Sequence, residues 1–168
     1  MKFLMNGTLY QGSKPVMWSP VEKTALAEAE IEYHDHKSHT IWVKFPVVRA
    51  VEPTGARSGL LGVDVVIWTT TPWTIPSNRA IAFNPELSYG LYKVIRAPEG
   101  NWAKKGDHYL LADNLAEEVF KSAKVEEYLR KRDVTSQQLD LLICAHPLRD
   151  AENGEGEWDY DVPMLPGD

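Results

Sequence analysis

The residues best suited to chemistry lie in one run, Trp68–Asn78, with the sequence WTTTPWTIPSN, called the threonine loop below. Its threonines and serine place hydroxyl groups beside two prolines, which fix the backbone φ and cannot donate a hydrogen bond to a strand. A stiff loop of this kind can hydrogen-bond a sugar, a phosphate or an ester carbonyl, and its two tryptophans can supply apolar walls. The alternative interpretation is a threonine-rich strand that runs into a proline turn and binds nothing.

Two other groups have residue types suited to chemistry. The stretch HDHKSH, residues 34–39, contains three histidines and an aspartate that could hold a metal ion. A polar turn between two strands accounts for the same residues, so we expect no metal. Cys144 and His146 have the spacing of two residues on one strand face, but no base or orienting partner can be identified, and we expect Cys144 to be a small core residue. Phosphate-binding glycine motifs are absent, so no nucleotide cofactor is expected.

Composition sets the broad class. The chain has 168 residues, 43% of them hydrophobic, which is enough for one domain with a real core. The sequence contains no apolar run long enough to span a bilayer, and the start, MKFLMNGTLYQG, lacks the apolar region of a signal peptide. With a single cysteine, it predicts a soluble cytoplasmic protein without a membrane contact. The net charge of −6 argues against strong non-specific binding of nucleic acid.

Alternating apolar and polar residues predict a chain made mostly of strands. Residues 1–21 are rich in turn formers and are interpreted as a lead-in, and 50–62 as an exposed loop. Two hairpins are expected, one through 34–39 and one through the turn Asn84-Pro85-Glu86. The predicted strands are 27–33, 40–48, 64–68, 80–83, 89–95, 108–112, 125–134 and 144–148, and the alternative for 125–134 is a continuation of the helix before it.

Two short helices are predicted among the strands. Asn114 is expected to cap the first, whose apolar face includes Val119 and Phe120. Thr135 or Ser136 is expected to cap the second, over residues 137–142. The prediction is a single α+β domain over 1–168, mostly β and barrel-like, with one or two short peripheral helices.

Two long segments, LYQGSKPVMWSPVEKTALAEAEIEY and DVVIWTTTPWTIPSNRAIAFNP, closely resemble the isoleucyl-tRNA synthetase family. The resemblance is to the insertion in the catalytic domain, the connective-peptide editing domain shared with the valyl and leucyl enzymes. It covers nearly the whole chain, and both motifs are long and specific.

The resemblance implies post-transfer editing, the hydrolysis of valine wrongly esterified to isoleucine tRNA. A pocket that binds isoleucine gains only about 1 to 3 kcal/mol over valine from one methylene, so accurate translation needs a second, smaller pocket. Thr70 and Thr71 are then expected to position the ester and an attacking water. The partner implied is the 3′ end of an aminoacylated tRNA, with no metal or cofactor in this segment and ATP used by the parent enzyme. The resemblance assigns substrate contacts to Trp68, Thr69, Thr70, Thr71, Trp73 and Asn78.

One departure from the family pattern affects the expected activity. The family completes its editing site with a later segment of the form His-Thr-Ala-Pro-Gly-His-Gly followed by Asp-Asp, which this sequence does not contain. We therefore expect a domain truncated at its C-terminal end and weak or inactive alone. The alternatives are a free-standing deacylase that clears mischarged tRNA and a non-catalytic β-barrel module that binds a ligand or a protein.

Overall fold

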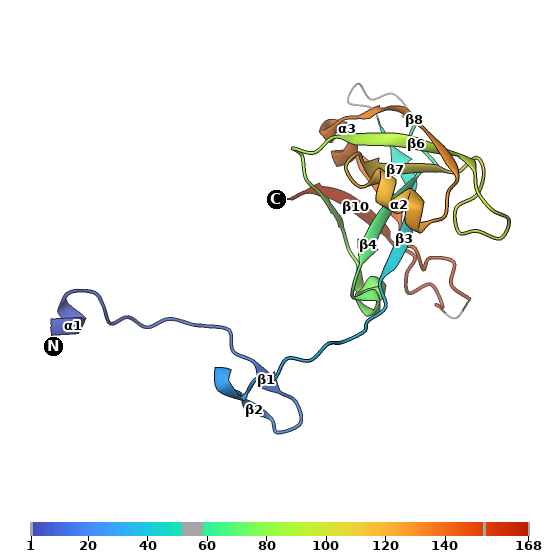
Figure 1. Ribbon diagram of the computed structural model, residues 1–168. Coiled ribbons are helices and arrows are strands. Elements are labelled where there is room, and N and C mark those ends of the chain that lie inside the picture. Colours follow the sequence, from blue (N-terminus) through green and yellow to red (C-terminus); the bar gives the residue numbers. More distant parts are fainter. Residues whose placement is uncertain (1, 52–58, 153, 168) are drawn as a thin grey trace. The chain divides into compact units, whose positions relative to one another are not determined.

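The computed structural model describes residues 2–51, 59–152 and 154–167 (Figure 1). The chain forms two compact units, Met1–Lys37 and Ser38–Asp168, and each is described by itself. None of the helices in the described ranges is both long and apolar enough to cross a membrane.

The first unit contains little regular structure. It consists of α1 (Lys2–Met5), the paired strands β1 (Trp18–Ser19) and β2 (Thr24–Ala25), and the 3-10 turn η1 (Glu28–Glu30). The predicted strand 27–33 is wrong, and so is the hairpin it was to form through 34–39. Its residues are exposed or half-buried, so the alternating pattern has no core to face, and the Glu30 carboxylate accepts the Ala27 amide N–H at 2.7 Å, which closes a turn.

The second unit is built on a mixed sheet with the order β5-β10-β9-β3-β4-β7-β6-β8. Its strands are β3 (Ile41–Ala50), β4 (Asp64–Thr69), β5 (Ile81–Phe83), β6 (Tyr89–Arg96), β7 (His108–Ala112), β8 (Glu127–Val134), β9 (Leu142–Ala145) and β10 (Asp161–Pro166). The mostly β, α+β prediction is confirmed. Within the described residues, however, the edge strands β5 and β8 do not pair, so the sheet is open and no closed barrel forms.

The pairing of β3 with β4 places the threonine loop. The two strands run antiparallel, with Phe45 opposite Val65 and Ile41 opposite Thr69. Figure 1 shows them side by side, with β4 running directly into a short coil. The β-branched residues of β4 favour this extended backbone, so a rigid strand delivers the loop to one end of the sheet.

Several local expectations differ from the structure. The predicted hairpin of 80–83 with 89–95 is wrong, because β5 pairs parallel with β10 while β6 pairs with β7 and β8. The predicted strand 144–148 ends early, at Ala145, since Pro147 two residues later cannot donate to a ladder. Of the predicted loop 50–62, residues 52–58 lie outside the described residues, and Leu60 is buried, contrary to the expected exposure.

Two clusters of buried side chains form the core of the second unit. The larger includes Phe45, Val65 and Leu110, and the smaller includes Tyr109 and Phe120. Helix α2 (Ala116–Ser122) contributes its apolar face to the smaller cluster, as predicted.

Of the two predicted helix caps, the first is wrong and the second is confirmed. The predicted cap Asn114 is wrong, because a turn in which the Leu115 amide N–H donates to the Ala112 carbonyl precedes the helix and puts Leu115 at the cap position. The apolar side chain of Leu115 makes no cap bond. The second helix, α3 (Ser136–Asp140), is capped by Thr135, one of the two predicted residues, whose hydroxyl accepts the Gln138 amide N–H.

Candidate functional site

Three threonine hydroxyls converge where β4 ends. Thr69, the last residue of β4, accepts the amide N–H of Thr71 on its hydroxyl at 3.0 Å, and the two hydroxyl oxygens lie 3.2 Å apart. The hydroxyl oxygens of Thr71 and Thr74 lie 3.5 Å apart. The carbonyl of Thr71 accepts both the amide N–H of Thr74, at 3.0 Å, and its hydroxyl, at 2.8 Å. Thr69 therefore fixes Thr71, and Thr71 fixes Thr74.

The loop continues as the 3-10 turn η2 (Pro72–Ser77). Pro72 stands at the first position, where its fixed φ suits a helical turn and its missing N–H costs nothing. Ile75 is the buried residue of the turn, and its carbonyl accepts the amide N–H of Asn78 at 2.9 Å. The stiffness expected from the two prolines thus takes the form of a short helical turn.

The two tryptophans assigned to the site differ in position, and only Trp68 is separated from the hydroxyls. Successive side chains of a strand point to opposite faces, so Trp68 lies on the face opposite Thr69. The ring of Trp68 packs against Trp42 with centroids 6.3 Å apart, on the side of the sheet covered by α2. Trp73 is 70% exposed, and Thr70 is also exposed. The structure therefore groups Thr69 with Thr71 and leaves Trp68 elsewhere.

Asn78, directly after the turn, has an unusual side chain. Its Oδ1 atom is buried and has no hydrogen-bond partner among the described residues. Buried polar atoms are nearly always paired, since an unpaired one costs free energy. The oxygen is also closed off from solvent, so it does not form part of an open binding surface.

A segment distant in sequence holds the back of the turn. His146 Nε2 lies 2.9 Å from the Ile75 carbonyl oxygen, and Trp158 Nε1 donates to the Pro76 carbonyl at 3.0 Å. The Tyr160 hydroxyl lies 3.2 Å from the Pro76 carbonyl and 3.0 Å from that of Asn78. These three residues, called the carbonyl clamp, were not identified from the sequence as partners of the loop, and nothing in their local pattern indicates that role.

Cys144 and His146 do not form a nucleophile and its base. Burial raises the pKa of the Cys144 thiol to about 12, so the thiol stays neutral and acts as a core side chain, as expected. His146 is 1% exposed, and both of its ring nitrogens are engaged, one with Ile75 and the other with the amide N–H of Leu148 at 3.2 Å.

The boundary between the two units falls inside the stretch 34–39, with residues 34–37 in the first unit and 38–39 in the second. Within the described residues no three histidine, cysteine, aspartate or glutamate side chains gather in a group that could hold a metal ion. His34 Nε2 lies 3.3 Å from a carboxylate oxygen of Glu32, and both side chains are about four-fifths exposed, at 79% and 81%.

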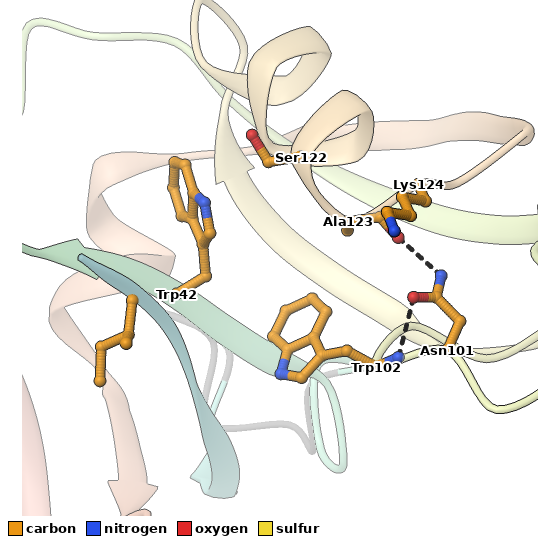
Figure 2. Close-up of a pocket in the computed structure, with 7 residues that line it drawn as sticks. Trp42, Asn101, Trp102, Ser122, Ala123 and Lys124 are labelled. Carbon is orange, nitrogen blue, oxygen red and sulfur yellow. Dashed lines mark hydrogen bonds between the residues drawn. The ribbon is translucent and has the colours of Figure 1, made fainter. Parts of the chain in front are cut away.

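A hollow of about 340 Å³ lies beside the sheet, between Trp42 and Trp102 (Figure 2). Asn101 closes one wall: its side-chain amide donates to the Ala123 carbonyl at 2.6 Å, and its Oδ1 accepts the amide N–H of Trp102 at 2.9 Å. A neighbouring hollow of about 390 Å³ shares both tryptophans and reaches the η2 turn at Pro72. Neither hollow is indicated by a pattern in the sequence.

Lys44, which lines the neighbouring hollow, anchors Trp102. Its ammonium group lies 4.3 Å from the centre of the Trp102 indole and donates to the Asp107 carboxylate at 3.0 Å. Burial alone raises the pKa of Asp107, but hydrogen bonds from Tyr109, the Lys104 amide and Lys44 outweigh it and leave that pKa below its ordinary value. Asp107 is therefore ionised at neutral pH and keeps the lysine in place.

An open mixed sheet that carries a hydroxyl-rich turn after a central strand defines a small α+β domain with a site at one sheet end. The chain belongs to the class I tRNA synthetases of the I, L, M and V group, whose family model matches residues 1–142.

Isoleucine--tRNA ligases are among the relatives that this chain resembles, which confirms the resemblance to that synthetase family. The chain is 57% identical over 168 residues to the isoleucine--tRNA ligase of Bradyrhizobium diazoefficiens and 57% identical over 168 residues to that of Rhodopseudomonas palustris. It is 46% identical over 168 residues to that of Brucella abortus. All of this chain is covered in each case, but it spans only 16% of the length of the first two relatives and 17% of the third.

Proposed function

We propose that this chain forms part of an editing domain that hydrolyses valine from isoleucine tRNA. The observation that carries the proposal is the convergence of the Thr69, Thr71 and Thr74 hydroxyls on a rigid turn at the end of β4. Hydroxyl groups held within 3.5 Å of one another can hydrogen-bond both an ester carbonyl and an attacking water.

The positions of the loop residues support the roles proposed for them. Thr71 is fixed through its amide and its carbonyl, so its hydroxyl is pre-organised for the ester. Thr70 is exposed beside it, and its proposed role is to orient the attacking water. Asn78 directly follows the turn and is the proposed contact for the terminal adenosine or the aminoacyl group, as the resemblance implies. Pre-organised groups of this kind accelerate a reaction because they need not reorganise in the transition state.

The need for editing is energetic. An aminoacylation site for isoleucine discriminates against valine by only about 1 to 3 kcal/mol. A second site must therefore hydrolyse the valyl-tRNA that is formed by mistake. The relatives that match this chain are isoleucine--tRNA ligases, the class of enzyme that meets this problem. With a net charge of −6, the chain does not attract tRNA by its own field, so the mischarged 3′ end is presented by the remainder of a cytoplasmic synthetase.

The test is a pair of substitutions in a full-length isoleucine--tRNA ligase that carries this segment. Thr70→Ala together with Thr71→Ala is expected to slow hydrolysis of valyl-tRNA by about a hundredfold, the scale on which positioning groups act, and to leave isoleucine activation unchanged. Thr40→Ala, an exposed threonine outside the loop, is the control. Unchanged hydrolysis in the double variant would refute the proposal.

A further inference from the structure

His146 is the buried polar residue of the described core, and its hydrogen bonds define its chemical form. Its Nδ1 lies 3.2 Å from the amide nitrogen of Leu148, which can only donate, so Nδ1 carries a lone pair. The proton of the neutral ring is therefore on Nε2, which donates to the Ile75 carbonyl at 2.9 Å. A ring with both nitrogens engaged and 1% exposure neither transfers protons nor binds a ligand.

The surroundings hold this ring in one orientation. Trp158 stacks nearly parallel to it, at 12° with centroids 6.4 Å apart, and the Tyr160 ring lies 5.0 Å away. Phe45, from the middle of β3, meets it edge-on at 6.5 Å. The imidazole is thus wedged between the sheet and the other two members of the carbonyl clamp.

The clamped carbonyl belongs to the turn that carries the hydroxyls. Ile75 lies in the middle of η2, one residue from Thr74, and its carbonyl also accepts the Asn78 amide N–H. Trp158 and Tyr160 both donate to the Pro76 carbonyl, but these two bonds are exposed to water, which can replace a lost donor. The bond from Tyr160 to the Asn78 carbonyl is partly buried. The bond from His146 is buried, where no water substitutes for it.

We propose that His146 is a positioning residue for editing: as the Nε2–H tautomer it fixes the Ile75 carbonyl and thereby the geometry of Thr71 and Thr74. This role rests on the proposed function of the threonine loop, although the restraint on the turn exists whatever the loop binds. His146 touches no substrate and acts only through the turn.

Two substitutions separate the two bonds of the ring. His146→Asn keeps an acceptor near the position of Nδ1, for Leu148, but is too short to reach Ile75. His146→Gln extends an amide N–H to the position of Nε2 and can still donate to the Ile75 carbonyl. The two variants are similar in polarity, so a difference in their behaviour measures the effect of the hydrogen bond to the Ile75 carbonyl.

The first readout is amide hydrogen exchange in this chain. The amides of Thr71, Thr74 and Asn78 all make hydrogen bonds within the loop. We expect them to exchange about tenfold faster in His146→Asn, as for the loss of one ordinary hydrogen bond, and to be close to native in His146→Gln. Equal exchange in both variants and the native chain would overturn the proposal.

The second readout is valyl-tRNA hydrolysis by a full-length isoleucine--tRNA ligase with the same changes. His146→Asn is expected to lower kcat about tenfold with KM unchanged, and His146→Gln to restore kcat. If the double threonine variant abolishes hydrolysis while His146→Asn does not alter kcat, the loop edits but His146 does not position it. If the double threonine variant hydrolyses valyl-tRNA normally, the proposed editing function is refuted. Hydrogen exchange then still tests whether His146 restrains the turn.

A third readout needs no substitution and covers the case in which His146→Asn fails to fold. The ring nitrogens of His146 in the native chain are expected to show a protonated Nε2 and an unprotonated Nδ1 by nitrogen NMR. A ring protonated on Nδ1 would contradict the proposal.

Discussion

At the scale of single residues, Asp113 shows how the structure sets a protonation state. Arg130 donates to both of its carboxylate oxygens, at 3.0 and 2.8 Å, and Tyr92 donates to one of them at 2.6 Å. The hydrogen bonds from Arg130, with that from Tyr92, outweigh burial and lower the pKa of Asp113 below its ordinary value. The ionised carboxylate therefore binds its partners in the folded state and gains nothing from them in the unfolded chain.

The sign of the resulting pH dependence is fixed. Because the folded pKa lies below the unfolded value of about 4, the stabilisation is fully present above pH 4 and is lost as the pH falls through the folded pKa. We expect Asp113→Asn to flatten this acid limb of the unfolding free energy. Urea unfolding between about pH 5 and pH 2 measures it, with Asp140→Asn, an exposed aspartate, as the control. An identical acid limb in Asp113→Asn and the native chain would show that the carboxylate is not coupled to folding.

The residues of the site could be predicted only in part. The loop hydroxyls were found because β-branched residues, threonines and prolines adjoin in the sequence, and Thr69 and Thr71 do meet. The separation of Trp68 from them follows from strand alternation and shows how neighbours in sequence can face opposite sides of a sheet. The carbonyl clamp could not be predicted, because His146 bonds a carbonyl 71 residues earlier in the chain.

At the scale of elements, β6 contains a glycine where the structure has no room for a side chain. A Cβ at Gly90 would lie 2.7 Å from Asp113 Oδ1, 2.9 Å from Arg130 Nε and 2.9 Å from the Tyr92 ring. The glycine therefore lets the ion pair lie directly across the strand.

Gly90→Ala is expected to lower the free energy of unfolding by about 1 to 3 kcal/mol, as overpacking does, because the ion pair must move. Chemical denaturation monitored by tryptophan fluorescence measures the change. Gly59→Ala is the matched control, since the nearest atom to its Cβ would be 3.8 Å away. A destabilisation no larger than that of the control would contradict this account of β6.

The existence of elements was easier to predict than their partners. β4, β7 and α3 follow from local signals, namely a β-branched run, a short apolar run and a threonine cap. The parallel pairing of β5 with β10 was missed because it joins segments about 80 residues apart, and no local pattern carries that information. The strand predicted at 27–33 failed because alternation predicts a strand only where one face can be buried.

At the scale of the whole molecule, two parts of the second unit hold the threonine loop in position. β3 and β4 carry the threonine loop to the end of the sheet, and the segment after β9 returns to hold its carbonyls. The fold class followed from the mostly alternating pattern. The open sheet did not, because closure depends on whether the edge strands β5 and β8 meet.

The most direct test of the central claim is a two-dimensional amide NMR spectrum of this chain during titration with a hydrolysis-resistant valyl-adenosine analogue. The isoleucyl analogue, which is larger by one methylene, is the matched control. We predict shifts confined to Trp68–Asn78 with the valyl analogue and much weaker shifts with the isoleucyl one. Shifts that centre instead on the hollow between Trp42 and Trp102, or equal responses to both analogues, would contradict the account of the threonine loop as an editing site.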